Sequence, residues 1–275
     1  MNHSDLQCMV VGIGAWGPGF SDWPTLQTLL RDGVSDAPLT VANPAPQIIP
    51  ANERRRAPLP VKIAVEVSWQ ALQQSGLAAG DVACVFGSGL GDTEITDYMC
   101  RVLTTELKQL SPTKFHNSVH NAAAGYWTIS SGCMKSANSI AAYHQTAGLA
   151  LLEGISQCVL QQEPVLITLF DTEAHATYRQ IFPCEQSFGA AILVQPMSAQ
   201  AGDDKPVVLT LTDEQHAAAV EFADPLLAKL AATNPAAGIL GLLSLLGQPP
   251  SSQAARTSLG IGPARAISLT VEHRQ

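Results

Sequence analysis

One stretch in the middle of the chain constrains the fold more than any other. A strand of small residues is expected at 138–142, an apolar helix at 147–158 and a second, apolar strand at 164–170. A strand–helix–strand unit of this kind implies that its two strands run parallel, because the helix returns the chain to the edge where it started. The sequence therefore predicts an α/β protein.

The same alternation of patterns extends along the rest of the chain. Further strands are expected at 7–13, 81–88, 190–195, 207–212 and 265–271. Helices are expected at 23–30, 61–75, 92–110, 214–232 and 236–246, the last of them very apolar. Proline-rich or polar connections are expected at 38–60, 199–206 and 248–253.

Length and charge limit the class of protein. The chain has 275 residues, a formal net charge of −8 and 46% hydrophobic residues, enough for one large core or one domain with a small appendage. The acidic balance argues against a nucleic-acid partner, which requires a basic face. No apolar run approaches the ~20 residues of a membrane span. No signal peptide is recognised at the N-terminus, so a cytoplasmic protein is expected.

The sequence gives no support for a metal site or a cofactor. The six cysteines have neither CxxC spacing nor a Cys/His pattern: Cys8, Cys84, Cys100, Cys133, Cys158 and Cys184. Most lie in apolar surroundings, so reduced and buried thiols are expected instead of zinc ligands. His116 and His120 are four residues apart but lack the glutamate of an HExxH motif.

Short motifs follow one another in a fixed order along the first two-thirds of the chain. They are Val-Val-Gly-Ile-Gly-Ala at 10–15, Glu-Arg-Arg-Arg at 53–56, Phe-Gly-Ser-Gly-Leu-Gly at 86–91, Phe-His-Asn-Ser-Val-His-Asn at 115–121, Gln-Thr-Ala-Gly-Leu at 145–149 and Phe-Asp-Thr-Glu-Ala at 170–174. In this order they resemble the N-terminal half of a β-ketoacyl synthase. The resemblance implies a thiolase-like, layered αβα sandwich with a shortened C-terminal half. Residues 1–198 would form the ketosynthase-like domain, and 199–275 a truncated segment that packs on the same core.

The departures from the family pattern concern catalysis. Gln145 stands where the family has its nucleophilic cysteine, at the turn from a strand into a helix. A glutamine forms no thioester and only donates and accepts hydrogen bonds. The family's two histidine motifs have no counterpart, although 234–243 and 258–262 resemble segments near the second histidine and the closing loop. The resemblance therefore implies a subunit that transfers no acyl group.

Within the family, glutamine in this place is typical of chain length factors, the non-acylating partners of ketosynthases. The compact length and the 115–121 run resemble the short chain-length-factor-like subunits of bacterial aryl polyene systems. The resemblance implies a heterodimer with an active ketosynthase through the strand around 138–143, and contact with acyl carrier protein mainly through that partner. The residues expected at the interface and the partner's acyl tunnel are Phe115, His120, Tyr143, His144, Gln145 and Thr146. The apolar stretch 236–246 is expected to cover an interface.

An enzyme acting alone is the alternative on the same fold, either a glutamine-type malonyl decarboxylase or a thioester hydrolase. His144 would be its candidate general base. The missing cysteine and histidines speak against it. A structural role is expected for Gln145, in which its side chain plugs the cysteine pocket and satisfies backbone groups.

A third hypothesis rests on the glycines near the N-terminus. Gly12, Gly14 and Gly17 match the dinucleotide fingerprint GxGxxG of an oxidoreductase, with Asp36 as the acid that binds the ribose. The bulky Trp16 fits this fingerprint badly. The glycines are better interpreted as a turn that closes the first strand.

The arginines at 54–56 allow two interpretations. A triple arginine in a loop is most often solvated or paired within the fold. Contact with an acidic carrier protein is the alternative. The sequence alone does not choose between them.

Overall fold

The fold is built on a single mixed β-sheet. The computed structural model describes residues 5–32, 41–199, 206–218, 220–251 and 253–274. The strands are β1 (Leu6–Trp16), β2 (Ala83–Gly87), β3 (Ala137–Ile140), β4 (Val165–Asp171), β5 (Phe188–Pro196), β6 (Val207–Glu214), β7 (Ala255–Gly262) and β8 (Arg265–His273). The α-helices are α1 (Trp23–Asp32), α2 (Ala51–Arg56), α3 (Leu59–Ser75), α4 (Thr93–Leu103), α5 (Pro112–Asn117), α6 (Ala122–Ser131), α7 (Thr146–Gln161), α8 (Pro225–Thr233) and α9 (Leu240–Leu246). Short 3-10 helices are η1 (Ala79–Asp81), η2 (Tyr143–Gln145), η3 (Ala176–Tyr178) and η4 (Pro235–Ile239).

The eight strands lie in the order β3-β2-β4-β5-β1-β6-β8-β7. β2 pairs in parallel with both β3 and β4, whereas each neighbouring pair from β4 onward is antiparallel. The two strands of the predicted strand–helix–strand unit are therefore parallel, as expected, but β2 lies between them. This arrangement leaves β3 as the strand at one edge of the sheet.

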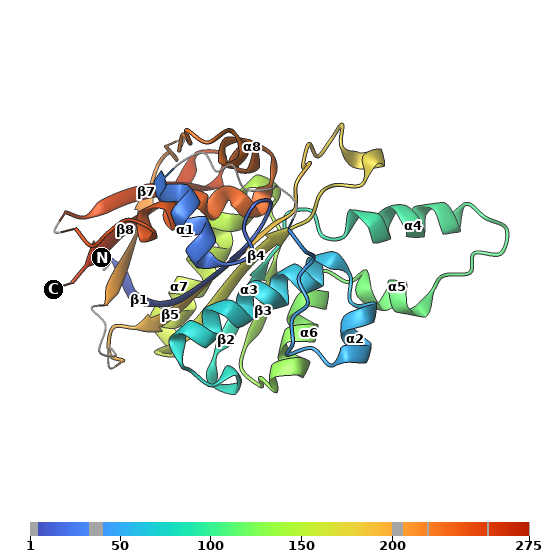
Figure 1. Ribbon diagram of the computed structural model, residues 1–275, viewed down its shortest axis with the longest axis horizontal. Coiled ribbons are helices and arrows are strands. Elements are labelled where there is room, and N and C mark those ends of the chain that lie inside the picture. Colours follow the sequence, from blue (N-terminus) through green and yellow to red (C-terminus); the bar gives the residue numbers. More distant parts are fainter. Residues whose placement is uncertain (1–4, 33–40, 200–205, 219, 252, 275) are drawn as a thin grey trace.

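Helices cover both faces of the sheet (Figure 1). α3 and α6 pack on one face around buried side chains such as Ile63 and Trp127. α7, α1 and α9 pack on the other face around Leu26, Leu151 and Leu243. This is the layered αβα arrangement predicted from the sequence. Figure 1 also shows α4 and α5 extending away from the body, at the end opposite the chain termini.

The glycines of the first strand serve close packing. Gly12 and Gly14 lie inside β1, and a β-carbon on either would be 2.0 Å from a carbonyl oxygen of α3, that of Ala71 or Val67. The predicted turn at these residues is therefore wrong. Because α3 fills the space beside them and the next helix begins only at Trp23, the dinucleotide interpretation is not supported. Asp36 lies outside the described residues.

The C-terminal segment continues the same sheet. β6 pairs with β1, and β8 and β7 follow as a hairpin. The helix predicted at 214–232 is shorter, because β6 runs to Glu214 and α8 begins only at Pro225, where Asp224 caps it by accepting from Leu227 N. β7 was not predicted, since Gly260 and Gly262 interrupt its pattern.

The apolar stretch 236–246 covers the protein's own core. It forms η4 and α9, whose side chains, among them Ile239, Leu240 and Leu242, are buried against the α7 face of the sheet. The expectation that this stretch covers an interface with another chain is therefore wrong.

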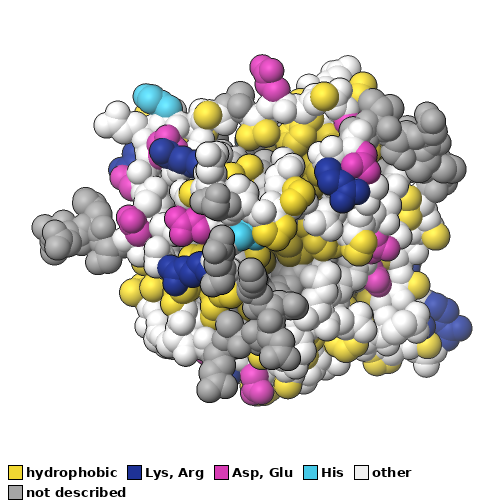
Figure 2. Space-filling view, turned by 60° about the vertical axis from the view of Figure 1, so that its left-hand side comes forward, with side chains coloured by type: hydrophobic (Ala, Val, Ile, Leu, Met, Phe, Trp, Pro, Cys, Tyr) yellow, Lys and Arg dark blue, Asp and Glu magenta, His cyan; other side chains and the backbone are white. Residues whose placement is uncertain are grey.

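On the face turned forward in Figure 2, hydrophobic side chains form a band between scattered charges of both signs.

Helix α4 ends earlier than predicted, at Leu103 instead of residue 110. The hydroxyls of Thr104 and Thr105 donate to the carbonyl oxygens of Arg101 and Val102, at 2.7 Å each. Threonine hydroxyls that bond to the preceding turn compete with helix continuation. The sequence periodicity did not reveal this competition.

No single helix in the described ranges is long and apolar enough to cross a membrane. The segments Pro225–Thr233 and Pro235–Leu246 pass that test only together, and they are bent by 113° relative to each other.

The packing of β1 on α3 predicts a strong effect of one methyl group. Gly12→Ala should lower the free energy of unfolding by at least about 2 kcal/mol, because a backbone carbonyl cannot move aside as a side chain does. Gly125→Ala is the matched control: Gly125 lies inside α6 with no atom within 4 Å of the added carbon. The control should gain about 0.5 kcal/mol from helix propensity. Urea denaturation measures both, and equal stability of the two variants would contradict the packing.

Candidate functional site

The candidate site is the turn from β3 into α7, where the sequence places Gln145. Tyr143 adopts a left-handed backbone with φ of 49°, whereas Gln145 has φ of −88°. The turn is closed by Ala142, whose N donates to Thr146 Oγ1 at 2.9 Å and whose carbonyl accepts from Gln145 N at 3.0 Å. Non-glycine residues adopt positive φ at a cost, often at functional turns. The constrained residue of this turn is thus Tyr143, two positions before Gln145.

The protein's own C-terminal segment covers the start of α7. A β-carbon on Gly148 would lie 2.4 Å from the carbonyl oxygen of Gly260 in β7. One on Gly238 in η4 would lie 3.0 Å from Ala147 Cβ. These close approaches hold β7 and η4 directly against the helix terminus.

Gln145 is half-buried, Thr146 is fully buried and His144 is exposed. Within the described ranges, no hydrogen bond joins the Gln145 side chain to another protein group. The sequence predicts that the Gln145 side chain pairs with backbone groups of the turn. In the structure, Thr146 Oγ1 accepts from the backbone N–H of Ala142 instead. The ring of His144 packs on that of Tyr143, with centroids 3.9 Å apart. Among the residues that the structure describes, no hydrogen bond joins the His144 ring to another side chain.

The thiol near this turn is Cys184. Burial raises its pKa to about 12, with a further contribution from the charge of Asp171, and it also raises the pKa of Tyr143. Cys184 Sγ donates to the carbonyl oxygens of Thr172 and Gln186, each at 3.4 Å. Because a thiol must ionise to act as a nucleophile, Cys184 does not replace the missing cysteine at neutral pH.

Asp171, at the end of β4, is a buried hydrogen-bonding centre. Its carboxylate accepts from Ser88 Oγ at 2.8 Å, from Leu90 N at 2.8 Å and from Gly89 N at 3.0 Å. Asn234 Nδ2 donates to the Asp171 carbonyl at 3.1 Å. Burial raises the pKa of Asp171 to about 6, although the donors favour the charged form. The residue thereby joins the β2–α4 loop to the segment that covers α7.

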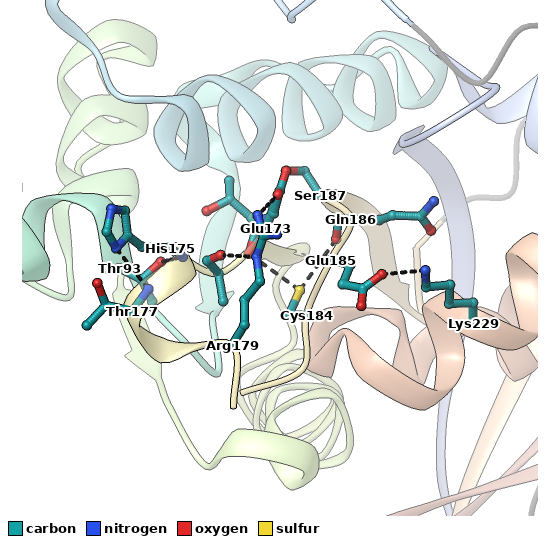
Figure 3. A network of polar contacts seen from close by, with 12 residues as sticks. Thr93, Glu173, His175, Thr177, Arg179, Cys184, Glu185, Gln186, Ser187 and Lys229 are labelled. Atoms are coloured by element: carbon teal, nitrogen blue, oxygen red, sulfur yellow. Dashed lines mark hydrogen bonds and ion pairs between the residues drawn. The ribbon is translucent and has the colours of Figure 1, made fainter. Parts of the chain in front are cut away.

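The 172–187 loop forms a second polar network beside this centre (Figure 3). Ala174 N donates to the Cys184 carbonyl at 2.8 Å, and ion pairs join Arg179 to Glu173 and Lys229 to Glu185. The ion pairs are about half exposed, so each contributes little to stability. The loop also packs on the candidate site. The rings of Phe182 and Tyr143 meet edge to face, with their centroids 5.4 Å apart.

The remaining predicted residues lie around α5. Phe115 is 57% exposed on α5, and His120 lies at the wall of a cavity between α5, α6 and α3. Tyr143, His144, Gln145 and Thr146 lie together at the α7 turn. Among the described residues, no group of three or more histidine, cysteine or acidic side chains is arranged to hold a metal ion.

The sequence predicts the arginines at 54–56 in a loop. In the structure they form the last turn of helix α2. Arg54 Nη1 donates to the Pro46 carbonyl at 3.1 Å and to Gln47 Oε1 at 2.9 Å. Arg55 bonds to Asn52 on the same helix. Two of the three arginines are therefore paired within the fold.

With this geometry in place, comparison with known proteins assigns the family. The family model described as the β-ketoacyl synthase N-terminal domain matches residues 30–236. The chain belongs to the β-ketoacyl synthase family. No curated protein matches it in sequence.

Solved structures share the fold at low sequence identity. A structure of the ketosynthase ApeO in complex with its chain length factor ApeC, from Xenorhabdus doucetiae, matches with a TM-score of 0.68 and 20% identity, over 96% of this chain and 99% of that chain. The ishigamide ketosynthase/chain length factor matches with a TM-score of 0.73 and 13% identity, over 98% and 100%. The module 6 ketosynthase of the Bacillus subtilis 168 bacillaene synthase matches with a TM-score of 0.69 and 9% identity, over 98% of this chain and 70% of that chain. The predicted thiolase-like ketosynthase fold is confirmed.

Two residues of the site were not predicted to matter. Asp171 was considered only as part of the 170–174 motif, and Asn234 only as the first residue of the 234–243 segment that resembles the family. A signal existed for both, because each is a polar residue beside an apolar run and must find partners once buried. Their partners come from distant segments, so the spacing of the sequence did not reveal them.

The buried Asp171 predicts a dependence of stability on pH. Its folded pKa of about 6 lies above the ordinary value of 3.8, so the native state holds more protons than the unfolded state between these values. This group's contribution to stability therefore falls as pH rises from about 4 to 6, by on the order of 3 kcal/mol. Asp171→Asn, which does not titrate, should lose this dependence.

The measurement is urea denaturation of both proteins at several pH values from 4.5 to 7.5. The stability advantage of the wild type over Asp171→Asn should shrink as pH rises. Asp81→Asn removes an exposed carboxylate and serves as the control. An advantage that grows with pH would show that the hydrogen bonds to the carboxylate outweigh its burial.

Proposed function

We propose that this chain is a non-catalytic, chain-length-factor-like subunit. It pairs with an active β-ketoacyl-acyl carrier protein synthase in fatty acid or polyketide biosynthesis, of the aryl polyene type. One observation carries the proposal: the turn into α7 bears Gln145, and the protein's own β7 and η4 lie against it. Condensation needs a thiolate nucleophile, and Gln145 cannot supply one.

The proposed dimer surface is the free edge of β3. Ser136 and Ile140 accept hydrogen bonds from β2 through their carbonyl oxygens, so the alternate residue Ser139 directs its N–H outward. Ile129 of α6 is 84% exposed, and Met134, in the turn that leads into β3, is 94% exposed. Exposed apolar side chains beside an unpaired strand favour a protein partner.

One solved structure supports a ketosynthase as that partner, and another supports the involvement of a carrier protein. The ApeO structure contains a ketosynthase with its chain length factor, and the AntDE:AntF structure contains an acyl-carrier protein with its ketosynthase. In the proposed complex the acyl chain is held by the partner, and Phe115, His120, Tyr143 and Gln145 border its tunnel. Carrier protein is bound mainly by the partner.

The proposal includes a cytoplasmic location. All six cysteines are free, and five of them are buried. Reduced thiols in this number fit a reducing compartment.

Co-expression tests the proposal. The tagged chain, produced with ketosynthases from its gene neighbourhood, should co-purify as a stoichiometric heterodimer by native mass spectrometry. Malonyl-carrier substrates should condense only when both chains are present. Gln145→Ala should change the condensation rate of the complex by less than about threefold, because no acyl group is bound to residue 145. Loss of a transition-state interaction of about 1.4 kcal/mol would instead lower that rate roughly tenfold. A homodimer that decarboxylates malonyl thioesters or hydrolyses thioesters by itself would instead establish the stand-alone enzyme.

A substitution in β3 tests the dimer surface. Ser139→Pro removes the outward N–H and spares the pairing with β2, since proline is tolerated on edge strands at outward positions. It should lower the recovery of the heterodimer at least about tenfold, the effect of 1.4 kcal/mol on an association constant. Ser139→Ala keeps the N–H and is the matched control. If Ser139→Pro assembles like the control, the partner binds elsewhere.

A further inference from the structure

Helix α4 is attached to the body of the protein by its first half. Its buried residues, Thr93, Ile95 and Asp97, all lie there, whereas 100–109 is exposed or partly exposed. Figure 1 shows α4 and α5 extending away from the sheet. The contacts of the first half of α4 therefore determine where the whole extension lies.

Helix α5 follows the position of α4, because Tyr98 joins the two helices. Ser111 N donates to Tyr98 Oη at 2.9 Å, and Lys114 Nζ lies 3.8 Å from the centroid of the Tyr98 ring. A cation over an aromatic face is a favourable contact. A change in how α4 is held is thus passed on to α5.

The 172–187 loop supplies polar contacts to α4 (Figure 3). His175 N donates to Thr93 Oγ1 at 2.9 Å, and Thr177 Oγ1 donates to Asp97 Oδ1 at 3.0 Å. Asp97 is only 8% exposed, so its carboxylate depends on partners within the protein. The loop and the first half of α4 therefore meet at this carboxylate.

The ring of His175 has two neighbours that compete for one nitrogen. Thr177 N donates to His175 Nδ1 at 3.3 Å and so caps η3, which requires Nδ1 to be without a proton. Asp97 Oδ1 lies 3.5 Å from the same nitrogen. A carboxylate only accepts hydrogen bonds, so it pairs with Nδ1 only when that nitrogen carries a proton. A proton on Nδ1 therefore exchanges the cap of η3 for a contact with α4.

On the α4 side, two charged groups surround this ring, Asp97 and Arg101. Arg101 Nε lies 2.6 Å from Asp97 Oδ2, which leaves Oδ1 to the loop. The Arg101 side chain is 71% exposed, so solvent weakens its effect, whereas the His175 side chain is 19% exposed. Asp97 is thus the charge that an imidazolium at His175 meets most directly.

The other titratable groups beside the ring are neutral or paired with each other. The rings of Tyr178 and His175 meet edge to face with centroids 6.4 Å apart, and Tyr178 Oη donates to Cys100 Sγ at 4.0 Å. A phenol and a thiol are ordinarily neutral between pH 5 and 7. Glu173 and Arg179, on the same loop, form an ion pair. Histidine is the side chain whose charge ordinarily changes in that range.

We propose that His175 is a proton-dependent clamp between the 172–187 loop and α4. With Nδ1 unprotonated, the ring caps η3. With a proton taken from solvent, Nδ1 donates to Asp97 Oδ1 and adds a charged hydrogen bond between the loop and α4, while η3 loses its cap. Acidification thus tightens α4, and through Tyr98 also α5, against the body. The proposal does not rest on the proposed function, because the clamp lies within one chain and is measured without a partner.

Amide hydrogen exchange of the full chain tests the clamp. It is followed by NMR at pH 5.5 and 7.5 and corrected for intrinsic exchange rates. Protection of the amides at 96–103 should be at least about threefold higher at pH 5.5, an effect typical of one partly exposed ion pair. Protection of the Thr177 amide should change in the opposite direction, because its acceptor is lost. Amides at 151–155 in α7 report global unfolding, and both effects are measured relative to them.

Two variants each remove one side of the ion pair. His175→Gln has no ring to protonate, so it should lose the change at 96–103. Asp97→Asn keeps an acceptor for Thr177 but removes the charge, so it should also lose that change although the histidine remains. His216→Gln removes an exposed histidine between β6 and α8 and is the matched control, which should behave as the wild type.

Three results would overturn the proposal. They are equal protection of α4 relative to α7 at the two pH values, a difference that survives His175→Gln or Asp97→Asn, and a Thr177 amide that changes in the same direction as α4. Thermal unfolding checks that each variant is folded. If one of the two does not fold, the other decides, since both break the same contact.

Discussion

The carboxyl edge of the sheet depends on one buried acid. Asp171 accepts three hydrogen bonds from 88–90, and its own carbonyl is held by Asn234. Asn234 Oδ1 in turn accepts from Ala236 N at 2.9 Å and so starts η4. The Asp171 side chain thus fixes the loop after β2, and the main-chain carbonyl of the same residue holds the segment that lies over α7. If the loop at 88–90 moved away, the buried carboxylate of Asp171 would lose its donors. The free-energy cost of that unpaired charge exceeds the net stabilisation from the three bonds, so the loop stays in contact with Asp171.

The proposed loss of condensation chemistry rests on the packing of the turn into α7 as well as on its residues. Gln145 removes the nucleophile, and the close approach of Gly148 to Gly260 brings β7 against the helix terminus. The nearby Cys184 stays protonated in its buried position. The left-handed residue of the turn is Tyr143, whose ring is held by Phe182 of the neighbouring loop. The turn into α7 is therefore closely packed by segments from two other parts of the chain.

Sequence patterns predicted the helices and strands with clear periodicity, including α3, α7, β2 and β4. Motif order predicted the family, because short motifs keep their positions even when their chemistry is lost. Two features escaped because they depend on distant contacts. Gly12 and Gly14 serve the approach of α3 to β1 and not a turn. β7 is stabilised by its pairing with β8, which overcomes the glycines in its sequence.

The shortness of β3 determines what kind of recognition its edge can support. Four residues span about 13 Å, and only every second one turns its backbone groups outward. So short a ladder protects the monomer from uncontrolled strand addition, which long flat edges invite. It also offers the same few backbone bonds to any strand. Discrimination between a foreign subunit and a second copy of this chain therefore rests on side chains such as Ile129 and Met134, where sequence can differ between partners while the backbone cannot.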